Sequence, residues 1–278
     1  MTCRIENNNF NIIKLIKSVL PVELKRRLRK VYDYIIRQCK PQGKPETKPE
    51  TKPETKPQRM PPVGKVDFGH LRRLQPIHDD YGWLTGQVID RYYIDKFLTR
   101  YSQDIHGRVL EIGIDDYTIK FGGKKVTKSD VLHYVEGNPK ATIVADLTKA
   151  DNIPSDSFDC IIITQTLQMI FDVRSAMRHL HRILKPGGVI LATSHGTSKI
   201  GRFLGIDAWG TYWHFTCQSK RFLFEEYFQP NNVHVEAWGN ILSATAFLYG
   251  LVVEDLKMEE LDYQDPRYEV LIGVRAVK

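Results

Sequence analysis

The chain has 278 residues, of which 42% are apolar, so it can bury a packed core and wholesale disorder is excluded. Its net charge of +7 is unevenly distributed. Residues 1–66 carry 16 Lys/Arg and 6 Asp/Glu, a balance of +10, which leaves −3 for the remaining 212 residues. Because this larger part is mildly acidic, the charge balance argues against a domain-wide nucleic-acid surface, and no nucleic-acid partner is expected.

The cysteines show no paired spacing, so the sequence suggests neither a disulfide framework nor a zinc site, and no metal is expected. They are Cys3, Cys39, Cys160 and Cys217. Lys14 and Lys17 interrupt the apolar N-terminal run, which argues against a secretory signal. No run reaches the ~20 apolar residues that cross a bilayer. We therefore expect a cytoplasmic protein.

Residues 1–38 form a basic arm with helical periodicity. Apolar residues recur at helical spacing before and after Pro21, and the second stretch contains the run "LKRRLRK". A basic amphipathic helix can lie on an anionic membrane surface, here through residues 10–37 at the inner face of the membrane, or dock on a protein partner. A helical hairpin packed on itself is the alternative.

Residues 39–65 are predicted to be a flexible linker. They contain three KPET repeats, residues 44–55. A proline at every fourth residue forbids helix, and the Lys and Glu side chains keep the backbone solvated. At ~3.1 Å per residue in an extended form, the 27 residues of this tether span up to ~80 Å.

From residue 66 to residue 278 the pattern predicts one α/β domain. Residues 88–101 read as a helix, and residues 108–113 as a buried strand. Three further strands are predicted at 124–132, 141–147 and 158–165, followed by a helix at 172–184 and a fifth strand at 189–194. The helix is expected to stop at the breakers Lys185–Gly188. This alternation predicts a Rossmann-like, mostly parallel twisted sheet with helices on both faces.

Ligands of such sheets bind beyond the carboxyl ends of the strands. The first strand ends at Glu111 and Gly113, the second is expected to end at Asp130, the third at Asp146 and the fourth at Gln165. An acid at the end of the second strand suits the two hydroxyls of a ribose. An acid at the end of the third suits the exocyclic amine of an adenine. The order of these residues therefore predicts a nucleotide cofactor.

The same segments carry a family resemblance. The runs VLEIG, VADL, "IPSDSFDCIII" and "RILKPGGVILAT", in this order and with Asp130 between the first two, resemble a class I S-adenosylmethionine (SAM)-dependent methyltransferase. The resemblance extends from about Gly86 to the C-terminus and is greatest to methyltransferase-type-11-like proteins that occur near bacterial glycosyltransferases. It implies SAM as the cofactor and S-adenosylhomocysteine as the product. The strand ends and chemical matching to SAM give the candidate cofactor-binding residues Arg91, Glu111, Gly113, Asp115, Asp130, Asp146, Leu147 and Gln165.

The chain departs from the family at the loop after the first strand. Typical members have two further glycines after VLEIG, where this chain has Asp115 and Tyr117. Gly122-Gly123 closes the loop early, so the first crossover helix is expected to be stunted. We interpret the loop as a working variant, in which Asp115 or Asp116 receives the amino group of the cofactor and Arg91 its carboxylate.

Methyl transfer needs alignment of the acceptor and, for a hydroxyl acceptor, a base. His195, just after the fifth strand, and His214 are the candidate catalytic residues. Tyr212 and Trp213 are candidates for stacking on an acceptor ring. Residues 240–256 are apolar around much of their circumference and are expected to form one buried helix. No metal constellation is apparent.

The resemblance implies transfer to a small-molecule or saccharide acceptor, as O-methylation in the tailoring of a bacterial polysaccharide or glycolipid. The alternative is a non-catalytic or SAM-sensing scaffold that partners a glycosyltransferase. The acids at the strand ends favour the enzyme, whereas the missing glycines favour the scaffold. Fold alone does not decide between them.

Overall fold

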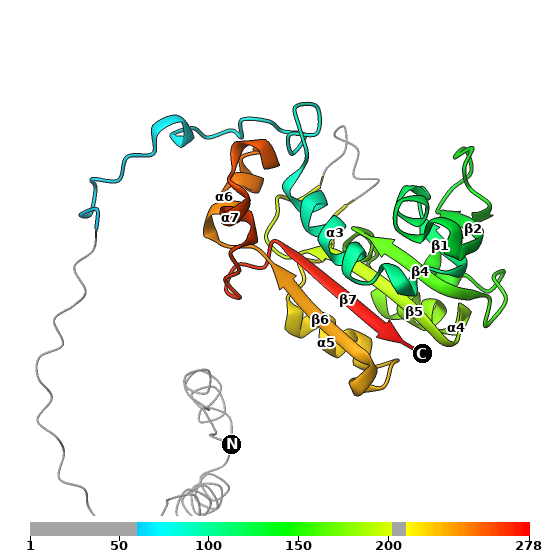
Figure 1. Cartoon of the computed structure of the whole chain (residues 1–278). Helices are drawn as coiled ribbons and strands as arrows, with labels where there is room; N and C mark the ends of the chain where they lie inside the picture. Colours follow the sequence, from blue (N-terminus) through cyan, green and yellow to red (C-terminus); the bar gives the residue numbers. More distant parts are fainter. Residues whose placement is uncertain (1–59, 202–209) are drawn as a thin grey trace, which may run out of the picture. The chain divides into compact units, whose positions relative to one another are not determined.

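The computed structural model describes residues 60–201 and 210–278. Residues Asp67–Lys278 form one compact unit, and its described residues are drawn in colour in Figure 1. The basic arm and the KPET repeats lie outside the described residues.

A seven-stranded sheet forms the centre of this unit, in the order β3-β2-β1-β4-β5-β7-β6. Strands β1 to β5 pair in parallel, and β7 runs antiparallel to both β5 and β6. The bounds are β1 (Gly107–Ile112), β2 (Val126–His133), β3 (Ile143–Val144), β4 (Phe158–Thr164), β5 (Leu184–His195), β6 (Val233–Trp238) and β7 (Leu271–Val277). The predicted Rossmann-like α/β fold is confirmed.

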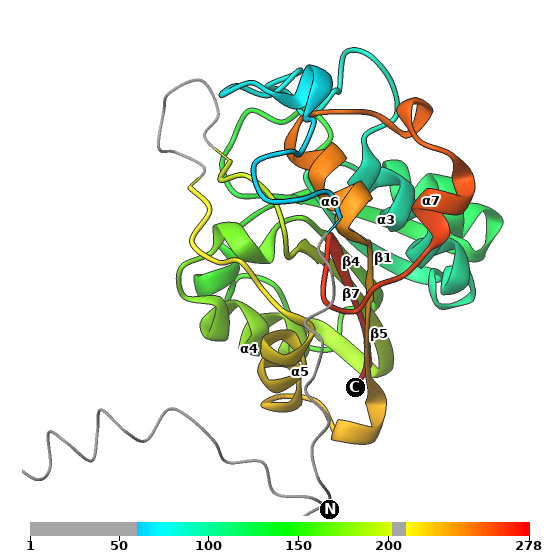
Figure 2. The same cartoon turned by 90° about the vertical axis from the view of Figure 1, so that its left-hand side faces the viewer.

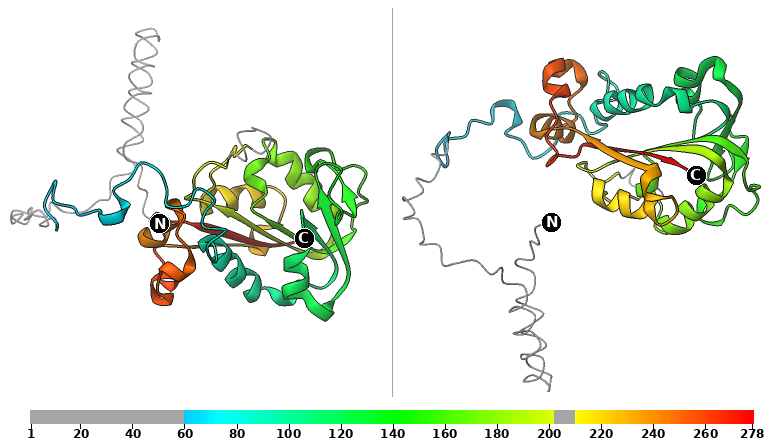
Figure 3. Two further views of the ribbon diagram at one scale, coloured as in Figure 1. Left: turned by 90° about the horizontal axis from the view of Figure 1, so that it is seen from above. Right: turned by 60° about the horizontal axis from the view of Figure 1, so that its bottom comes forward.

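Helices cover both faces of the sheet, as Figures 2 and 3 show. Helices α3 (Ile89–Arg100) and α6 (Ile241–Leu248) lie on one face, and α4 (Val173–Ile183) and α5 (Cys217–Glu225) on the other. The short helix α7 (Met258–Asp262) packs beside α6. An apolar core fills each of the two layers. Within the described ranges, no helix combines the length and hydropathy that crossing a bilayer requires.

Local sequence explains where α4 begins and how β5 follows it. The Asp172 carboxylate accepts a hydrogen bond from the Ser175 amide (3.0 Å) and caps the helix. Helix α4 ends at Ile183, directly before the expected breakers Lys185–Gly188, but these residues already belong to β5. The strand begins at Leu184, directly after α4. Its pairing with β4 shifts register between Leu184 and Val189, and Gly187 adopts the positive φ (+77°) within this irregular stretch.

The crossover after β1 is stunted, as predicted. It consists of a π-helical turn at Thr118–Gly122 and a 3₁₀ turn at Gly123–Lys125. A β-carbon at Gly122 would collide with the side chains of Ile105 and Val126. The tight glycine pair therefore brings the chain back to β2 without a long helix.

The expectation of one buried helix at residues 240–256 was wrong. Helix α6 ends at Leu248, because the chain turns at Gly250 with φ +70°. A β-carbon at Gly250 would collide with the backbone of His78. Val252 then pairs with Val88, and Ile241 is exposed on the outer side of α6.

Candidate functional site

A cleft of about 880 Å³ lies beyond the carboxyl ends of the parallel strands. Its wall is built from the segments after β1, β2, β3 and β4, together with one side of α3. This is the edge at which open parallel sheets bind their ligands. Several of the residues predicted from the strand ends line it: Gly113, Asp146, Leu147 and Gln165.

Glu111 and Gly113 shape the loop after β1. The buried Glu111 carboxylate accepts hydrogen bonds from the Tyr117 amide (3.3 Å) and from the Thr118 amide and hydroxyl (both 2.7 Å). Burial raises the pKa of Glu111 to about 7, although these hydrogen bonds act against the shift. Gly113 has φ +85°, and a β-carbon there would meet no atom within 4 Å, so the backbone borders open space.

The two aspartates of this loop share one cation. The Lys140 ammonium lies 3.1 Å from Asp115 and 3.1 Å from Asp116. Asp116 lines the cleft, whereas Asp115 lies outside its described lining. Of the two acids expected to meet the amino group of a cofactor, the structure therefore places Asp116 at the cavity.

Arg91 brings a cation to the cleft from α3. Its guanidinium lies over the Trp83 ring, 5.6 Å from the ring centre, and one nitrogen is 4.0 Å from Asp90. The side chain keeps 33% of its surface exposed. A guanidinium in this position can form a bidentate pair with a carboxylate.

The expectation that Asp130 ends the second strand was wrong. Strand β2 continues for three more residues, and Asp130 is buried within it, outside the described lining of the cleft. Its carboxylate accepts hydrogen bonds from Arg108 (2.6 Å) and from Thr142 (2.9 Å). Burial alone would raise the pKa of Asp130, but these partners outweigh it and lower the pKa. The residues of this strand end that line the cleft are His133 and Tyr134.

Strand β3 ends at Val144, so Asp146, expected at the strand end, lies two residues beyond it, and Leu147 follows. One Asp146 oxygen accepts hydrogen bonds from the amide and hydroxyl of Thr148, both at 2.8 Å, and caps the 3₁₀ turn Leu147–Lys149. Because Asp146 also lines the cleft, its carboxylate can face a hydrogen-bond donor of a ligand.

Gln165 ties the end of β4 to three other segments. It has φ +48°, an uncommon conformation for a non-glycine residue. Its amide nitrogen donates to Asp90 (3.1 Å), and its amide oxygen accepts from the Gln168 side chain (2.9 Å) and the His195 backbone (3.1 Å). Asp90 was missed by sequence reasoning. The available signal was an acid on the buried face of α3, beside Ile89 and Tyr93.

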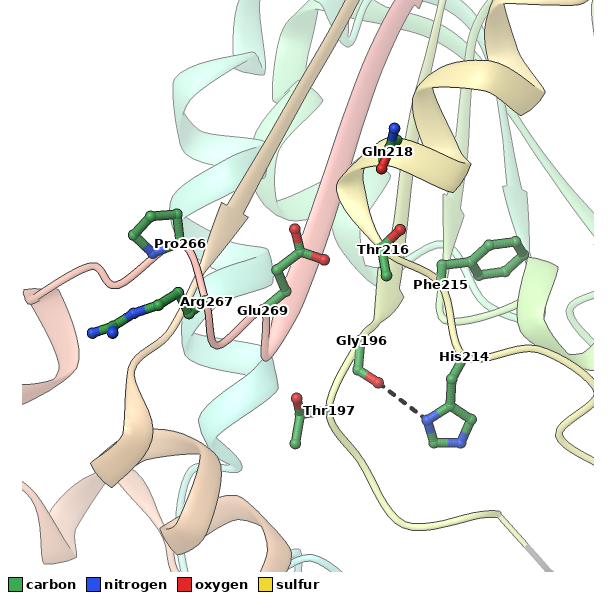
Figure 4. A pocket seen from close by; sticks show the side chains of 9 residues that line it. All are labelled: Gly196, Thr197, His214, Phe215, Thr216, Gln218, Pro266, Arg267 and Glu269. Carbon is green, nitrogen blue, oxygen red and sulfur yellow. Dashed lines mark hydrogen bonds between the residues drawn. The ribbon is translucent and has the colours of Figure 1, made fainter. Parts of the chain in front are cut away.

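The two predicted catalytic histidines lie together, but beside the cleft. Their ring centres are 5.5 Å apart, and both residues are outside the described lining of the cleft. Burial, followed by the charges of His214, Lys220 and Arg91, lowers the pKa of His195 to about 4. His214 Nδ1 lies 3.1 Å from the Gly196 carbonyl oxygen. His214 lines a second cavity of about 430 Å³ (Figure 4).

Aromatic residues surround the mouth of the cleft. Tyr212 lines it and is 57% exposed. The Phe171 ring lies 5.5 Å from Tyr212 and 6.3 Å from Trp213, between ring centres. The Trp213 indole donates to the Ile170 carbonyl (2.9 Å), which fixes its position just outside the lining. Phe171 was missed, because a single aromatic residue before a helix carries no signal of its own.

Residues 95–192 match the protein family described as "Methyltransferase domain". This range runs from α3 through β1 to β5 and includes the loop that Glu111 organises. The domain has a Rossmann-like methyltransferase fold. Family match and sheet order together support a class I SAM-dependent methyltransferase. Among the described residues, no group of His, Cys, Asp and Glu is arranged to hold a metal ion.

Curated relatives of the methyltransferase domain include the ubiquinone/menaquinone biosynthesis C-methyltransferases UbiE. The protein of Enterobacter sp. (strain 638) is 34% identical over 129 residues, 45% of each chain. That of Klebsiella pneumoniae subsp. pneumoniae is 35% identical over 88 residues, 31% of this chain and 32% of the relative. The chain therefore matches less than half the length of these relatives.

Solved structures similar to the domain include a SAM-dependent methyltransferase from Archaeoglobus fulgidus. It is 13% identical, with a TM-score of 0.46, over 68% of this chain and 94% of its own. A second, from Mesorhizobium loti, is 18% identical with a TM-score of 0.43, over 68% of this chain and 98% of its own.

Proposed function

We propose that the protein transfers a methyl group from SAM to a hydroxyl group of a small-molecule or saccharide acceptor. The observation that carries this proposal is the cleft at the carboxyl edge of β1 to β4, where Glu111 holds the loop and Gly113 leaves its backbone open. SAM supplies an activated methyl carbon when it is bound. The chain's own task is then to orient the acceptor and to exclude water.

The lining residues match the parts of the cofactor. Arg91 would pair with its carboxylate and Asp116 would receive its amino group. Asp146 would accept a hydrogen bond from the adenine amine, with Leu147 beside the ring. His133 and Tyr134 take the place beside the ribose that the sequence had assigned to Asp130. Side chains thus replace the bare backbone that additional glycines would provide.

Calorimetric titration of S-adenosylhomocysteine tests the cofactor site. We expect Arg91→Ala to weaken binding by at least tenfold, because a charged hydrogen-bonded pair is lost. Arg100→Ala is the matched control: Arg100 lies on the same helix and also packs over an indole ring, that of Trp238, 5.8 Å away. Equal affinities of the two variants would contradict the assignment of Arg91.

The acceptor is the less constrained part of the proposal. The relatives are named as C-methyltransferases of quinone biosynthesis, whereas the family context implied a saccharide hydroxyl. Both chemistries place a ring and a hydroxyl group at the methyl donor. Incubation with SAM and either hydroquinone or a panel of methyl glycosides, followed by NMR of the product, distinguishes a carbon-bound from an oxygen-bound methyl group. Methylation of hydroquinone carbon alone would refute O-methylation.

One observation favours the rival scaffold function. Tyr117 lines the cleft where the family has a glycine, and its ring packs against Phe121 with 6.1 Å between ring centres. A scaffold in which this ring blocks the cofactor would fold normally and leave S-adenosylhomocysteine unbound. The same titration therefore decides between the enzyme and the scaffold.

A further inference from the structure

A buried carboxylate lies next to Gln165, behind the lining of the cleft, without a full set of hydrogen bonds. Asp90, in the first turn of α3, is 7% exposed. One of its oxygens, Oδ2, accepts a hydrogen bond from Gln165. The other, Oδ1, is buried and has no hydrogen-bond partner in the part of the chain that the structure describes. Leaving a buried carboxylate oxygen without a hydrogen bond costs free energy, so we expect a ligand to donate a hydrogen bond to this atom.

The position of Asp90 is fixed by Gln165. The backbone N–H of His195 can only donate, so the atom of Gln165 that it meets at 3.1 Å is the amide oxygen. The amide nitrogen of Gln165 must then face Asp90, at 3.1 Å. Because Gln165 itself lines the cleft, the Asp90 carboxylate is held directly behind the cavity wall. Arg91, the next residue of α3, also lines the cavity.

The Gln168 side chain also has a buried oxygen without a hydrogen-bond partner among the described residues. Gln168 donates to Gln165 through its nitrogen, and its Oε1 is buried with no partner among the described residues. Asp90 Oδ1 and Gln168 Oε1 are both hydrogen-bond acceptors. Two unsatisfied acceptors linked to one residue at the carboxyl end of β4 fit a ligand group that carries a proton, such as a hydroxyl.

We propose that Asp90 is a catalytic base that binds the acceptor hydroxyl and takes its proton, with Gln165 as its positioning residue. This inference rests on the proposed function and adds the group that takes the proton of the acceptor hydroxyl. The acceptor oxygen forms a bond to the methyl carbon as the carbon–sulfur bond breaks, and that bond's electron pair remains on sulfur. The hydroxyl proton moves to Asp90 Oδ1, and later to solvent.

His195 is the rival base. Its Nε2 atom is also buried, with no partner in residues 60–201 or 210–278. However, its ring packs against His214, and only its backbone N–H contacts Gln165. Asp90 instead contacts Gln165 through its side chain, so its carboxylate is bound to a residue that lines the cleft, although Asp90 itself is outside the described lining.

The test compares two cofactor analogues by calorimetry on the full chain. Sinefungin carries an amine in place of the methyl sulfonium of SAM, whereas S-adenosylhomocysteine carries nothing there. If Asp90 Oδ1 lies at the transferring methyl, sinefungin binds on the order of tenfold more tightly or better, through a charged hydrogen bond. Asp90→Asn keeps a carbonyl oxygen for Gln165 but replaces the anionic acceptor, so it abolishes this preference. Asp90→Ser is the second variant if Asn prevents folding.

Affinity for S-adenosylhomocysteine should stay within about twofold of wild type in Asp90→Asn, since this ligand lacks the amine. His195→Asn keeps the backbone bond to Gln165 and should keep the preference. The inference is overturned if wild type shows no preference, if the preference survives Asp90→Asn, or if only His195→Asn removes it. Failure of wild type to bind S-adenosylhomocysteine would refute the proposed function itself, and is a separate readout.

Discussion

The Arg108 guanidinium donates to the Asp130 carboxylate at 2.6 Å and joins the neighbouring strands β1 and β2. Only 3% of the Asp130 side chain is exposed, and the Arg108 side chain also lies over the Phe158 ring, 4.7 Å from its centre. An acid that sequence order had assigned to a cofactor ribose is thus part of an ion pair inside the sheet.

Asp130→Ala should therefore lower stability and spare the cleft. We expect the free energy of unfolding to fall by about 1–3 kcal/mol, because the Arg108 guanidinium loses its partner. Affinity for S-adenosylhomocysteine should remain within about twofold of wild type. Urea denaturation and calorimetry measure the two effects. A tenfold loss of affinity for S-adenosylhomocysteine in a stable Asp130→Ala protein would show that Asp130 does bind the cofactor.

Replacement of both partners provides the control for this ion pair. Arg108→Met with Asp130→Leu leaves no uncompensated buried charge, so the double variant should be more stable than Asp130→Ala. A double variant less stable than Asp130→Ala would show that the ion pair stabilises the fold by more than the free energy needed to bury its two charges.

Lys220→Met should stabilise the protein. The Lys220 ammonium is fully buried, 4.2 Å from the Phe215 ring centre, and has no hydrogen-bond partner within the described ranges. Burial lowers its pKa to about 7. Between pH 7 and about 10.5 the unfolded chain binds a proton that the folded chain does not, so wild-type stability rises with pH across this window. The increase in the free energy of unfolding caused by Lys220→Met should then be largest at pH 7 and become smaller toward pH 10.

Thermal denaturation of both proteins at pH 7, 8.5 and 10 measures this gain. Arg221→Met, at the next position of α5 and 3.6 Å from Glu225, is the exposed control and should show little change. A destabilised Lys220→Met protein would mean that the amine has a partner in the folded chain that holds its charge.

Glu111 should make stability depend on pH in the opposite direction. Its pKa is raised to about 7 by burial, against 4.5 for the ordinary group. Between these values the folded state binds the proton more tightly, so its contribution is complete below pH 4.5 and is lost as the pH rises toward 7. Glu111→Gln does not titrate. The free energy of unfolding of wild type minus that of Glu111→Gln should therefore fall by up to about 1.4 kcal/mol per pH unit across this window.

Urea titrations at pH 5, 6 and 7 measure this difference. Other titrating groups cancel in the comparison, because the two proteins differ at one position only. If the free energy of unfolding of wild type rises relative to that of Glu111→Gln as the pH rises, the Glu111 carboxylate is stabilised in its ionised form by Thr118 and the loop amides.

Apolar periodicity predicted the five parallel strands and helices α3 and α4, because the spacing of apolar residues is a local property of the sequence, but it did not predict β6. The early turn at Gly122-Gly123 was predictable for the same reason. The end of α6 was not, since it depends on the close approach of His78 to Gly250, far apart in sequence.

The candidate site was predictable where it depends on strand ends, as for Gly113, Asp146 and Gln165. It was not predictable where a strand end had to be located to within three residues, as for Asp130. The bond between Asp90 and Gln165 spans 75 residues of sequence, and only the folded sheet brings the two side chains together.

The most direct test of a working cofactor site is calorimetric titration of S-adenosylhomocysteine into wild type, Gly113→Val and Gly187→Val. Both glycines have positive φ (+85° and +77°), and a β-carbon at either meets no atom within 4 Å, but only Gly113 lines the cleft. We predict micromolar binding by wild type and Gly187→Val, about −8 kcal/mol, and a loss of at least tenfold in Gly113→Val. A folded wild-type protein that binds no S-adenosylhomocysteine would contradict the account.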